Sequence, residues 1–515
     1  MRTLLWTAFF SSSLVCMTNS DATIGILVPI VYQGFRFLQF QQMATAAILA
    51  VHHVNTRDPS IVGDAIDQLP LGFSLKYKIS DTHFSTPGSV QAILDWRNQE
   101  GYAGFANVCP GAKTNQTWSN TSLGMYGTIS SSDKILTIVG SDISEASKAV
   151  AVIAGLGGTP LISYYSTATT LSDKKKYPAF SRSVPAQSFN TNGLASIIAN
   201  FGWFKCAVLY SDSEYGTSFS ADFQQYAASQ GIKIALLRKF TDNDASSLNE
   251  AVLDLRASGA RIFVFLAQGA ENFAALLAAG DRAGIVGVDG YVWISSEISG
   301  ANDPEAFIAA AADPPRARRL LAGSLTIAVD ALYGDKRRRF EQAYASADPA
   351  AVYDPLVRMP AAGFAPPRTP YDAFAYDAVW AAALGAAAAR ADRSDLLGRI
   401  RAARFTGASG TVAFDPATGD RAPEGLQVRD TARGPARARR PAPEVRDSGS
   451  LVSEPGVQPT PARLSNRRPT VCAPGPRAGR GRGPRPWAHS PRHRPAGPAQ
   501  ELECIVRFIA RRMTQ

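Results

Sequence analysis

Two kinds of hydrophobic pattern alternate along the first part of the chain. Residues 24–28 form a continuous apolar run, which is typical of a strand that is buried on both faces of a parallel sheet. Between residues 40 and 54 the apolar positions instead recur at steps of three and one, which predicts a helix with one buried face. The same patterns predict strands at 24–28, 73–79 and 135–139 and helices at 40–54, 90–100 and 144–154.

A second series of the same kind begins near residue 206. It predicts strands at 206–210, 232–237, 262–266 and 291–294, and helices at 219–228, 248–257, 270–283 and, further on, 371–389. With 515 residues, 45% of them hydrophobic, the chain can bury several such units. Two units in tandem predict an α/β fold of two doubly wound parallel-sheet lobes with a ligand cleft between them. Loops and helix N-termini meet there, beyond the carboxyl ends of the strands.

The net charge of +10 is concentrated in one segment near the end of the chain. Residues 431–500 contain 14 arginines, no lysine and three acidic residues, whereas the other residues carry 39 basic and 40 acidic side chains. The segment also has 14 prolines and no hydrophobic period, so we predict that 431–515 is a disordered Pro/Arg/Gly-rich tail. Arginines suit a polyanion, but a secreted protein rarely meets RNA, and we expect no nucleic-acid partner.

The first 20 residues have the pattern of a secretory signal peptide. Arg2 precedes an apolar stretch that is too short to span a membrane, followed by small residues; a buried N-terminal helix is the alternative. Asn115 and Asn120 each begin a glycosylation sequon, as expected for a secreted loop. The apolar run at 373–389 contains Asp377, so we expect a packed helix there and no membrane span in this chain. These features predict entry into the secretory pathway.

Motifs that carry metal or catalytic chemistry are missing. The five cysteines, Cys16, Cys109, Cys206, Cys472 and Cys504, show no CxxC spacing, so we expect no zinc site, no disulfide-built scaffold and no cofactor. Cys206 lies in an apolar strand and is expected to pack there, whereas Cys109 lies in a loop and either pairs or stays free. The chain has no GxSxG, GxxxxGK[ST] or HExxH motif, which argues against an enzyme.

Several ordered motifs resemble one known family. They are GSDISE at 140–145, the segment that runs from YYSTATT to SRSVP at 164–185, LYSDSEYG at 209–216, YDAVWA at 376–381 and FTGASGTVAFD at 405–415. Over roughly residues 22–430 they resemble the receptor-family ligand-binding region, a type 1 periplasmic-binding-protein-like or Venus flytrap domain. The resemblance is closest to class C G-protein-coupled receptors, particularly the metabotropic GABA and glutamate receptors.

This resemblance implies two lobes that are joined by three crossings and that close on a ligand. Lobe 1 would comprise about 22–184 and 328–403, and lobe 2 about 185–327 and 404–430. The resemblance also implies a homodimer formed through lobe 1 and, in a full-length receptor, a location at the cell surface.

The same resemblance assigns candidate ligand contacts. Ser144, at the start of a predicted helix, matches the hydroxyl that contacts the carboxylate of an amino acid, and a helix N-terminus favours such an anion. Thr167 resembles the second carboxylate contact, with Ser166 as the option shifted by one residue. Tyr215 matches the aromatic residue that lobe 2 brings across the ligand. Glu297 lies near the position of the acidic partner of the ammonium group.

Each contact also has a simpler interpretation, in which the serine is a helix N-cap, the threonine a turn residue, the tyrosine a packing residue and the glutamate a solvated acid. Moreover, Asp142 and Glu145 flank Ser144 where glutamate receptors carry small neutral residues. Two carboxylates at that place would weaken an anion site.

The leading hypothesis is an extracellular domain of a membrane receptor that binds an amino-acid-like small molecule and senses it by cleft closure. In this hypothesis the membrane part is missing from the chain, and the residues after about 430 are a misassembled stretch that replaces it. The alternative is a free-standing secreted solute-binding protein for amino acids or related metabolites. A third hypothesis gives the tail, with its RG-like 480–483, a role in nucleic-acid or membrane binding.

Overall fold

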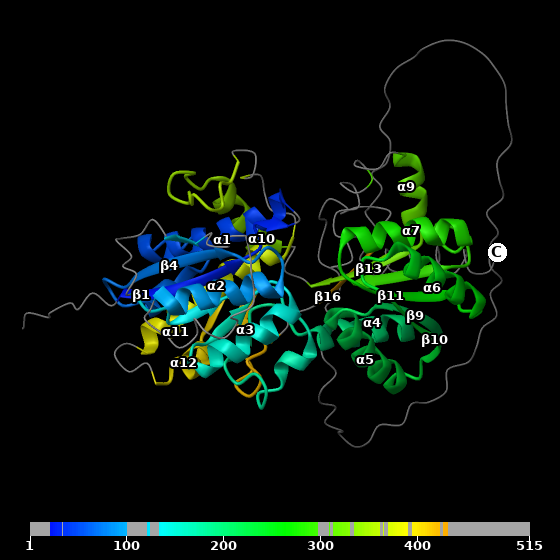
Figure 1. Cartoon of the computed structure of the whole chain (residues 1–515), viewed down its shortest axis with the longest axis horizontal. Helices are drawn as coiled ribbons and strands as arrows, with labels where there is room; N and C mark the ends of the chain where they lie inside the picture. Colours follow the sequence, from blue (N-terminus) through cyan, green and yellow to red (C-terminus); the bar gives the residue numbers. More distant parts are fainter. Residues whose placement is uncertain are drawn as a thin grey trace, which may run out of the picture.

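The computed structural model forms two α/β units that lie side by side along the long axis of the molecule (Figure 1). It describes residues 21–32, 34–99, 121–123, 133–296, 308, 313–329, 334–360, 364, 369–389, 394–422 and 426–430. The predicted signal peptide, the tail, Cys109, both sequons (Asn115 and Asn120) and Glu297 lie outside the described residues. Each unit contains a six-stranded sheet with helices on both faces. The predicted fold class is confirmed.

The first sheet has the strand order β5-β4-β1-β6-β7-β8, and all neighbours are parallel except β5 with β4. Ile24 and Ile26 of β1 belong to the buried cluster that contains α1 and α11, whereas Leu27 belongs to the cluster that contains α2 and α3. The elements of this unit are β1 (Asp21–Val28), β4 (Ser74–Asp81), β5 (Thr121–Leu123), β6 (Thr137–Val139), β7 (Leu161–Ser163), β8 (Phe180–Arg182), α1 (Leu38–Thr56), α2 (Thr86–Gln99), α3 (Ser144–Leu156), α10 (Gly334–Ala345), α11 (Tyr371–Ala389) and α12 (Leu396–Ala402).

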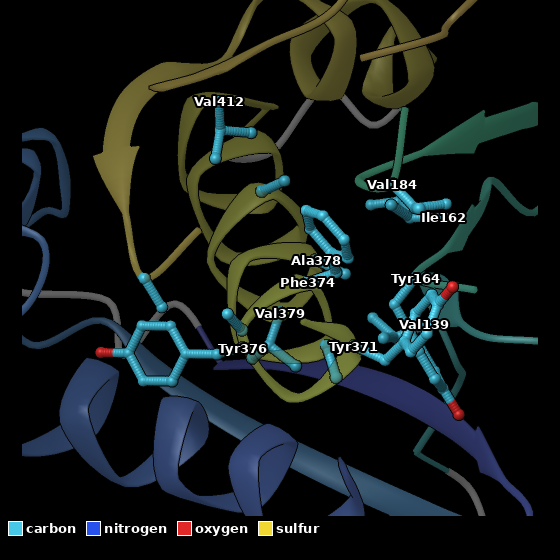
Figure 2. Close-up of a cluster of buried hydrophobic side chains, with 14 of the residues drawn as sticks. Val139, Ile162, Tyr164, Val184, Tyr371, Phe374, Tyr376, Ala378, Val379 and Val412 are labelled. Carbon is cyan, nitrogen blue, oxygen red and sulfur yellow. The ribbon is translucent and has the colours of Figure 1, made fainter. Parts of the chain in front are cut away.

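Helix α11 forms the centre of the first unit, and its side chains are almost all buried. Its many alanines allow α1 and α12 to approach closely. Figure 2 shows α11 between the strands that carry Val139 and Ile162 and the hairpin that carries Val412. The prediction of a packed helix at 371–389 is confirmed, because the buried Asp377 finds partners inside the protein.

The second sheet has the order β10-β9-β11-β12-β13-β16, with only β16 antiparallel to its neighbour. Helices α4 and α5 cover one face, and α6, α7 and α9 cover the other (Figure 1). Cys206 is buried in β9, as predicted. The elements are β9 (Lys205–Ser211), β10 (Lys233–Phe240), β11 (Ile262–Leu266), β12 (Val292–Ser296), β13 (Ser324–Val329), β16 (Leu426–Asp430), α4 (Gln187–Asn200), α5 (Glu214–Ser229), α6 (Ala245–Ala257), α7 (Ala270–Ala283) and α9 (Pro314–Leu321).

Sequence patterns missed several elements and misplaced one boundary. β7 and β8 have three residues each, which is too short for a readable alternation, and α4, α9, α10, β13 and β16 were not predicted. The hairpin of β14 (Arg404–Gly407) and β15 (Gly410–Ala413) was assigned to lobe 2 with the rest of 404–430. It packs instead against α11 and the 3-10 helix η1 (Gly63–Gln68) of the first unit, and within that range β16 joins the second sheet.

Candidate ligand-binding site

The carboxyl ends of the first sheet bring together the hydroxyl groups that the sequence singled out. Ser144 begins α3, directly beyond β6, and is buried, with 3% of its surface exposed. The Ser144 Oγ accepts a hydrogen bond from the Ala168 N–H at 3.3 Å, in the loop after β7. The residue at the N-cap position is Ile143, so Ser144 is not the helix cap that the simpler interpretation required.

Ser166 and Thr167 lie in that same loop, and both are buried. The Ser166 hydroxyl is 2.8 Å from the Ser147 hydroxyl of α3. The Thr167 carbonyl accepts a hydrogen bond from the Gln187 N–H at 2.8 Å, at the start of α4 in the second unit. The loop therefore connects the N-terminus of α3 in the first unit with the N-terminus of α4 in the second unit.

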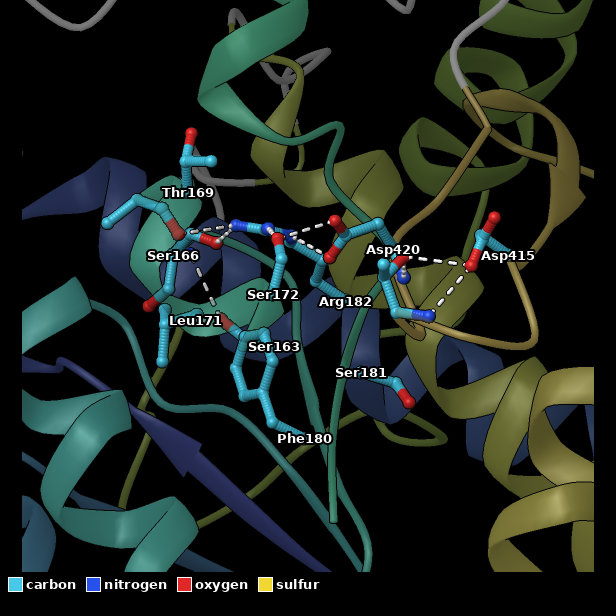
Figure 3. Close-up of polar contacts among 12 residues, drawn as sticks. Ser163, Ser166, Thr169, Leu171, Ser172, Phe180, Ser181, Arg182, Asp415 and Asp420 are labelled. Atoms are coloured by element: carbon cyan, nitrogen blue, oxygen red, sulfur yellow. Dashed lines mark hydrogen bonds and ion pairs between the residues drawn. The ribbon is translucent and has the colours of Figure 1, made fainter. Parts of the chain in front are cut away.

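A buried arginine that the sequence analysis did not single out holds this loop in shape. Figure 3 shows Arg182, at the end of β8, with its guanidinium between the 166–172 loop and Asp420. Arg182 Nη1 donates to the carbonyls of Ser166 and Ala168 at 3.3 and 3.0 Å, and Nε donates to Asp420 Oδ1 at 2.7 Å. Ser172 completes the network by donating to Asp420 Oδ2 at 2.6 Å. Arg182 lies in one of the motifs that carried the family resemblance, the segment at 164–185.

Tyr215 enters from the second unit, in the first turn of α5. It is 1% exposed, and its ring packs edge-on against Phe219 with 5.5 Å between ring centroids. The start of α5 is capped by Ser213, whose Oγ accepts from the Gly216 N–H at 3.2 Å. Tyr215 thus lies at a third helix N-terminus, that of α5.

Gln187 joins the candidate residues of the two lobes, and the sequence analysis missed it. Its backbone N–H binds Thr167, and its side-chain Nε2 donates to the Tyr215 carbonyl at 3.1 Å. Gln187 is fully buried, and its Oε1 has no hydrogen-bond partner among the described residues. A buried acceptor without a donor is costly, and Gln187 Oε1 shares this condition with other buried polar atoms of the described region, such as Asn190 Oδ1 in the same helix.

The two acids that flank Ser144 have different surroundings. Asp142 is fully buried and accepts hydrogen bonds from Thr82 Oγ1 at 2.9 Å and Ser141 Oγ at 2.6 Å. Burial raises the pKa of the Asp142 carboxyl above its ordinary value. Glu145 instead reaches across to the second unit, where its Oε1 accepts from the Glu214 N–H at 2.6 Å. Both carboxylates therefore have donors of their own.

Helix α5 makes further contacts with the first unit around Glu214. The Glu214 carboxylate forms an ion pair with Lys148 of α3 and accepts a hydrogen bond from Thr170 Oγ1 at 3.0 Å. Thr169 also donates to Asp222 of α5. These contacts connect the two lobes beside the candidate site.

Asp242 of the second unit lies in the field of acids from both units. Burial raises the pKa of the Asp242 carboxyl, and the negative charges of Asp212 and Glu145 raise it further. Glu297, the predicted ammonium partner, lies outside the described residues.

Comparison with known proteins identifies the family. A model described as the receptor family ligand binding region matches residues 42–432. The chain is 25% identical over 300 residues to metabotropic glutamate receptor-like protein E of Dictyostelium discoideum, covering 55% of this chain and 34% of that protein. It is 30% identical over 165 residues to G-protein coupled receptor family C group 6 member A of Carassius auratus, covering 32% of this chain and 17% of that protein. The chain thus spans about a third or less of the length of these relatives.

The chain belongs to the receptor family ligand-binding region, as the match over most of its length shows. The resemblance predicted from the sequence motifs is confirmed, and both relatives are of the class C receptor type. This is a family of receptors and not of enzymes, in agreement with the sequence analysis. Among the described residues, no helix has the length and hydrophobicity that a membrane crossing requires.

Proposed function

We propose that this chain is the extracellular part of a receptor and binds an amino-acid-like small molecule between its two lobes. The observation that carries the proposal is the convergence of three helix N-termini, those of α3, α4 and α5, on one buried cluster formed by Ser144, Thr167, Gln187 and Tyr215. Helix N-termini favour a carboxylate, because their backbone N–H groups and dipoles are positive. The free Gln187 Oε1 and the nearby acids favour an ammonium group.

Binding would act through the relative position of the lobes. The contacts of Glu214 with Glu145, Lys148 and Thr170 join α5 to the first unit beside the site. A ligand that touches both lobes stabilises the arrangement in which these contacts form, and it shifts the population towards that arrangement. In a membrane receptor this closure would be the signal.

We also propose that two copies of the chain associate through the first lobe. Helix α3 exposes Val152 and Leu156, one turn apart, with 48% and 77% of their surfaces accessible, and Ile153 between them is half-buried. An apolar stripe on one helix is a typical centre for a dimer contact. Sedimentation of the full chain should show a dimer that Leu156→Asp dissociates, and a monomeric wild type would refute this proposal.

Ligand binding is tested by thermal unfolding of the full chain with a panel of α-amino acids. A ligand at about 100 times its Kd adds about 2.7 kcal/mol to the free energy of unfolding and raises the midpoint. Ser144→Ala should abolish this rise while leaving the ligand-free midpoint nearly unchanged. Ser229→Ala, at the exposed end of α5, is the matched control and should behave as the wild type. An unchanged rise in Ser144→Ala would place the site elsewhere.

A further inference from the structure

A row of aromatic rings extends away from the candidate site along the first lobe. Tyr165, next to Ser166, lies 4.1 Å from Tyr371 and 6.3 Å from Phe84 between ring centroids. Phe84 in turn lies 5.5 Å from Tyr32. Because Tyr32, Phe84 and Tyr165 follow strands β1, β4 and β7, they lie at the same sheet edge as the candidate site.

Three of these rings are incompletely buried although they pack on one another. Tyr32, Phe84 and Tyr165 are half-buried, whereas Tyr371 is 3% exposed. Burying the remaining aromatic surface would be favourable, at about 25 cal/mol per Å². Phe84 meets Tyr32 and Tyr165 edge to face, at 72° and 89°, and one of its faces stacks on Phe40 at 23°. A further ring can extend such an arrangement.

The backbone that presents these rings is held in an unusual conformation. Phe84 and the preceding His83 both have φ of 52°, in the left-handed region that non-glycine residues rarely adopt. The buried Asp81 carboxylate holds the segment, because it accepts from the His83 N–H at 2.8 Å. It also accepts from the N–H groups of Ile30 and Val31 at 2.9 and 3.1 Å, which positions the neighbouring Tyr32. One carboxylate thus fixes the loops on which two of the rings lie.

The titratable side chains nearest to these rings are Asp81 and His83, whose Oδ2 and Nδ1 lie 3.5 Å apart. The described loops that follow β1, β4 and β6 contain one arginine, Arg36, and no lysine. In the loop after β7, the first basic residue is Lys174. The Arg36 Nη1 donates to the carbonyls of Leu356 and Val357 at 2.8 and 3.2 Å. The Asp81 carboxylate is occupied by backbone N–H groups. A ligand with a second carboxylate would therefore find less compensation here than a ligand with an apolar ring.

We propose that the ligand is an aromatic amino acid whose ring packs against Phe84, Tyr165 and Tyr32 while its head group occupies the cluster around Ser144 and Thr167. This inference rests on the proposed function, because it names the ligand class of the same site. Phe84 is the residue that determines specificity, since its ring contacts both tyrosines.

The test compares L-phenylalanine, L-leucine, L-alanine, L-glutamate and L-arginine as ligands of the full chain, with Kd taken from thermal unfolding or calorimetry. L-phenylalanine should bind most tightly. One aromatic contact corresponds to about two- to tenfold in Kd, so Phe84→Leu should weaken L-phenylalanine by about that factor and leave L-alanine unchanged. Tyr32→Leu is the second variant if Phe84→Leu fails to fold. Phe201→Leu, which alters a half-buried ring stacked on Trp203 in the second lobe, is the matched control and should have no effect on Kd.

Tighter binding of L-glutamate, L-arginine or L-leucine than of L-phenylalanine would overturn the aromatic inference and leave the proposed function standing. An equal loss for L-phenylalanine and L-alanine in the variant would also overturn it, because the ring would then not be what Phe84 contacts. If no amino acid binds the folded wild type, the proposed function itself fails.

Discussion

The buried carboxylate of Asp377 allows a sharp test of what holds the first unit together. Asp377 lies in α11 and accepts hydrogen bonds from the Ala408 N–H at 2.7 Å, the Ser409 N–H at 3.0 Å and the Ser409 hydroxyl. Arg421 Nη1 lies 3.8 Å from its Oδ2, and the side chains of Arg421 and Asp377 are 3% and 0% exposed. Asp377 thus connects α11, the β14–β15 hairpin and the segment that leads to the second lobe.

Replacing Asp377 with Asn removes the charge but keeps the size of the side chain. The amide places an N–H₂ group among donors and leaves Arg421 without its ionic partner. Breaking a buried pair in this way costs about 3–5 kcal/mol, a large part of a total stability of about 5–15 kcal/mol. For a unit of about 150–250 residues, each kcal/mol lowers the midpoint by about 2–4 °C, so we expect a decrease of about 10 °C.

The assay is scanning calorimetry of the full chain, compared with Asp254→Asn as the matched control. Asp254 pairs with Arg238 at 2.7 Å, but the side chains of Asp254 and Arg238 are 54% and 37% exposed, and such pairs contribute about 0–1 kcal/mol. The control should therefore shift the midpoint by only about 2 °C. If Asp377→Asn is no more destabilising than the control, the buried network does not stabilise the unit as argued here.

Three further predictions follow from other parts of the structure. Burial lowers the pKa of Lys174 to about 7, so between about pH 7 and 10 the unfolded chain binds more protons than the folded chain. The free energy of unfolding, measured in urea, should therefore rise with pH over this window. Lys174→Met should abolish the rise. A Cβ on Gly385 would lie 2.4 Å from Ile400 Cγ1, so Gly385→Ala should destabilise the chain by about 1–3 kcal/mol in urea unfolding, despite the better helix propensity of alanine; an unchanged or higher stability would contradict this. Glu214→Lys places like charges across the lobe contact and should increase the radius of gyration in X-ray scattering, whereas Glu250→Lys, on the exposed face of α6, should not.

The amino-acid sequence by itself determined the elements whose residues carry a local pattern. The continuous apolar run of β11, the amphipathic spacing of α7 and the alanine-rich α11 were predicted at their observed bounds, because burial on one or both faces leaves a regular hydrophobic period. The ordered motifs similarly indicated the family, and through it the serine at the start of α3 and the loop after β7. These features depend on residues that are close together in the chain.

Only the tertiary structure decided the contacts between distant residues. Arg182 and Asp420 are 238 positions apart, Asp377 and Ser409 are 32 apart, and the ring of Tyr371 meets that of Tyr165 across more than 200 residues. Gln187 gained its place between the lobes in the same way, from the position of α4 relative to the loop after β7. No local period records such pairs, because they arise when sheet order and helix packing bring separate loops to one edge. The partners at the candidate site were therefore not readable from the sequence, although most of its secondary structure was.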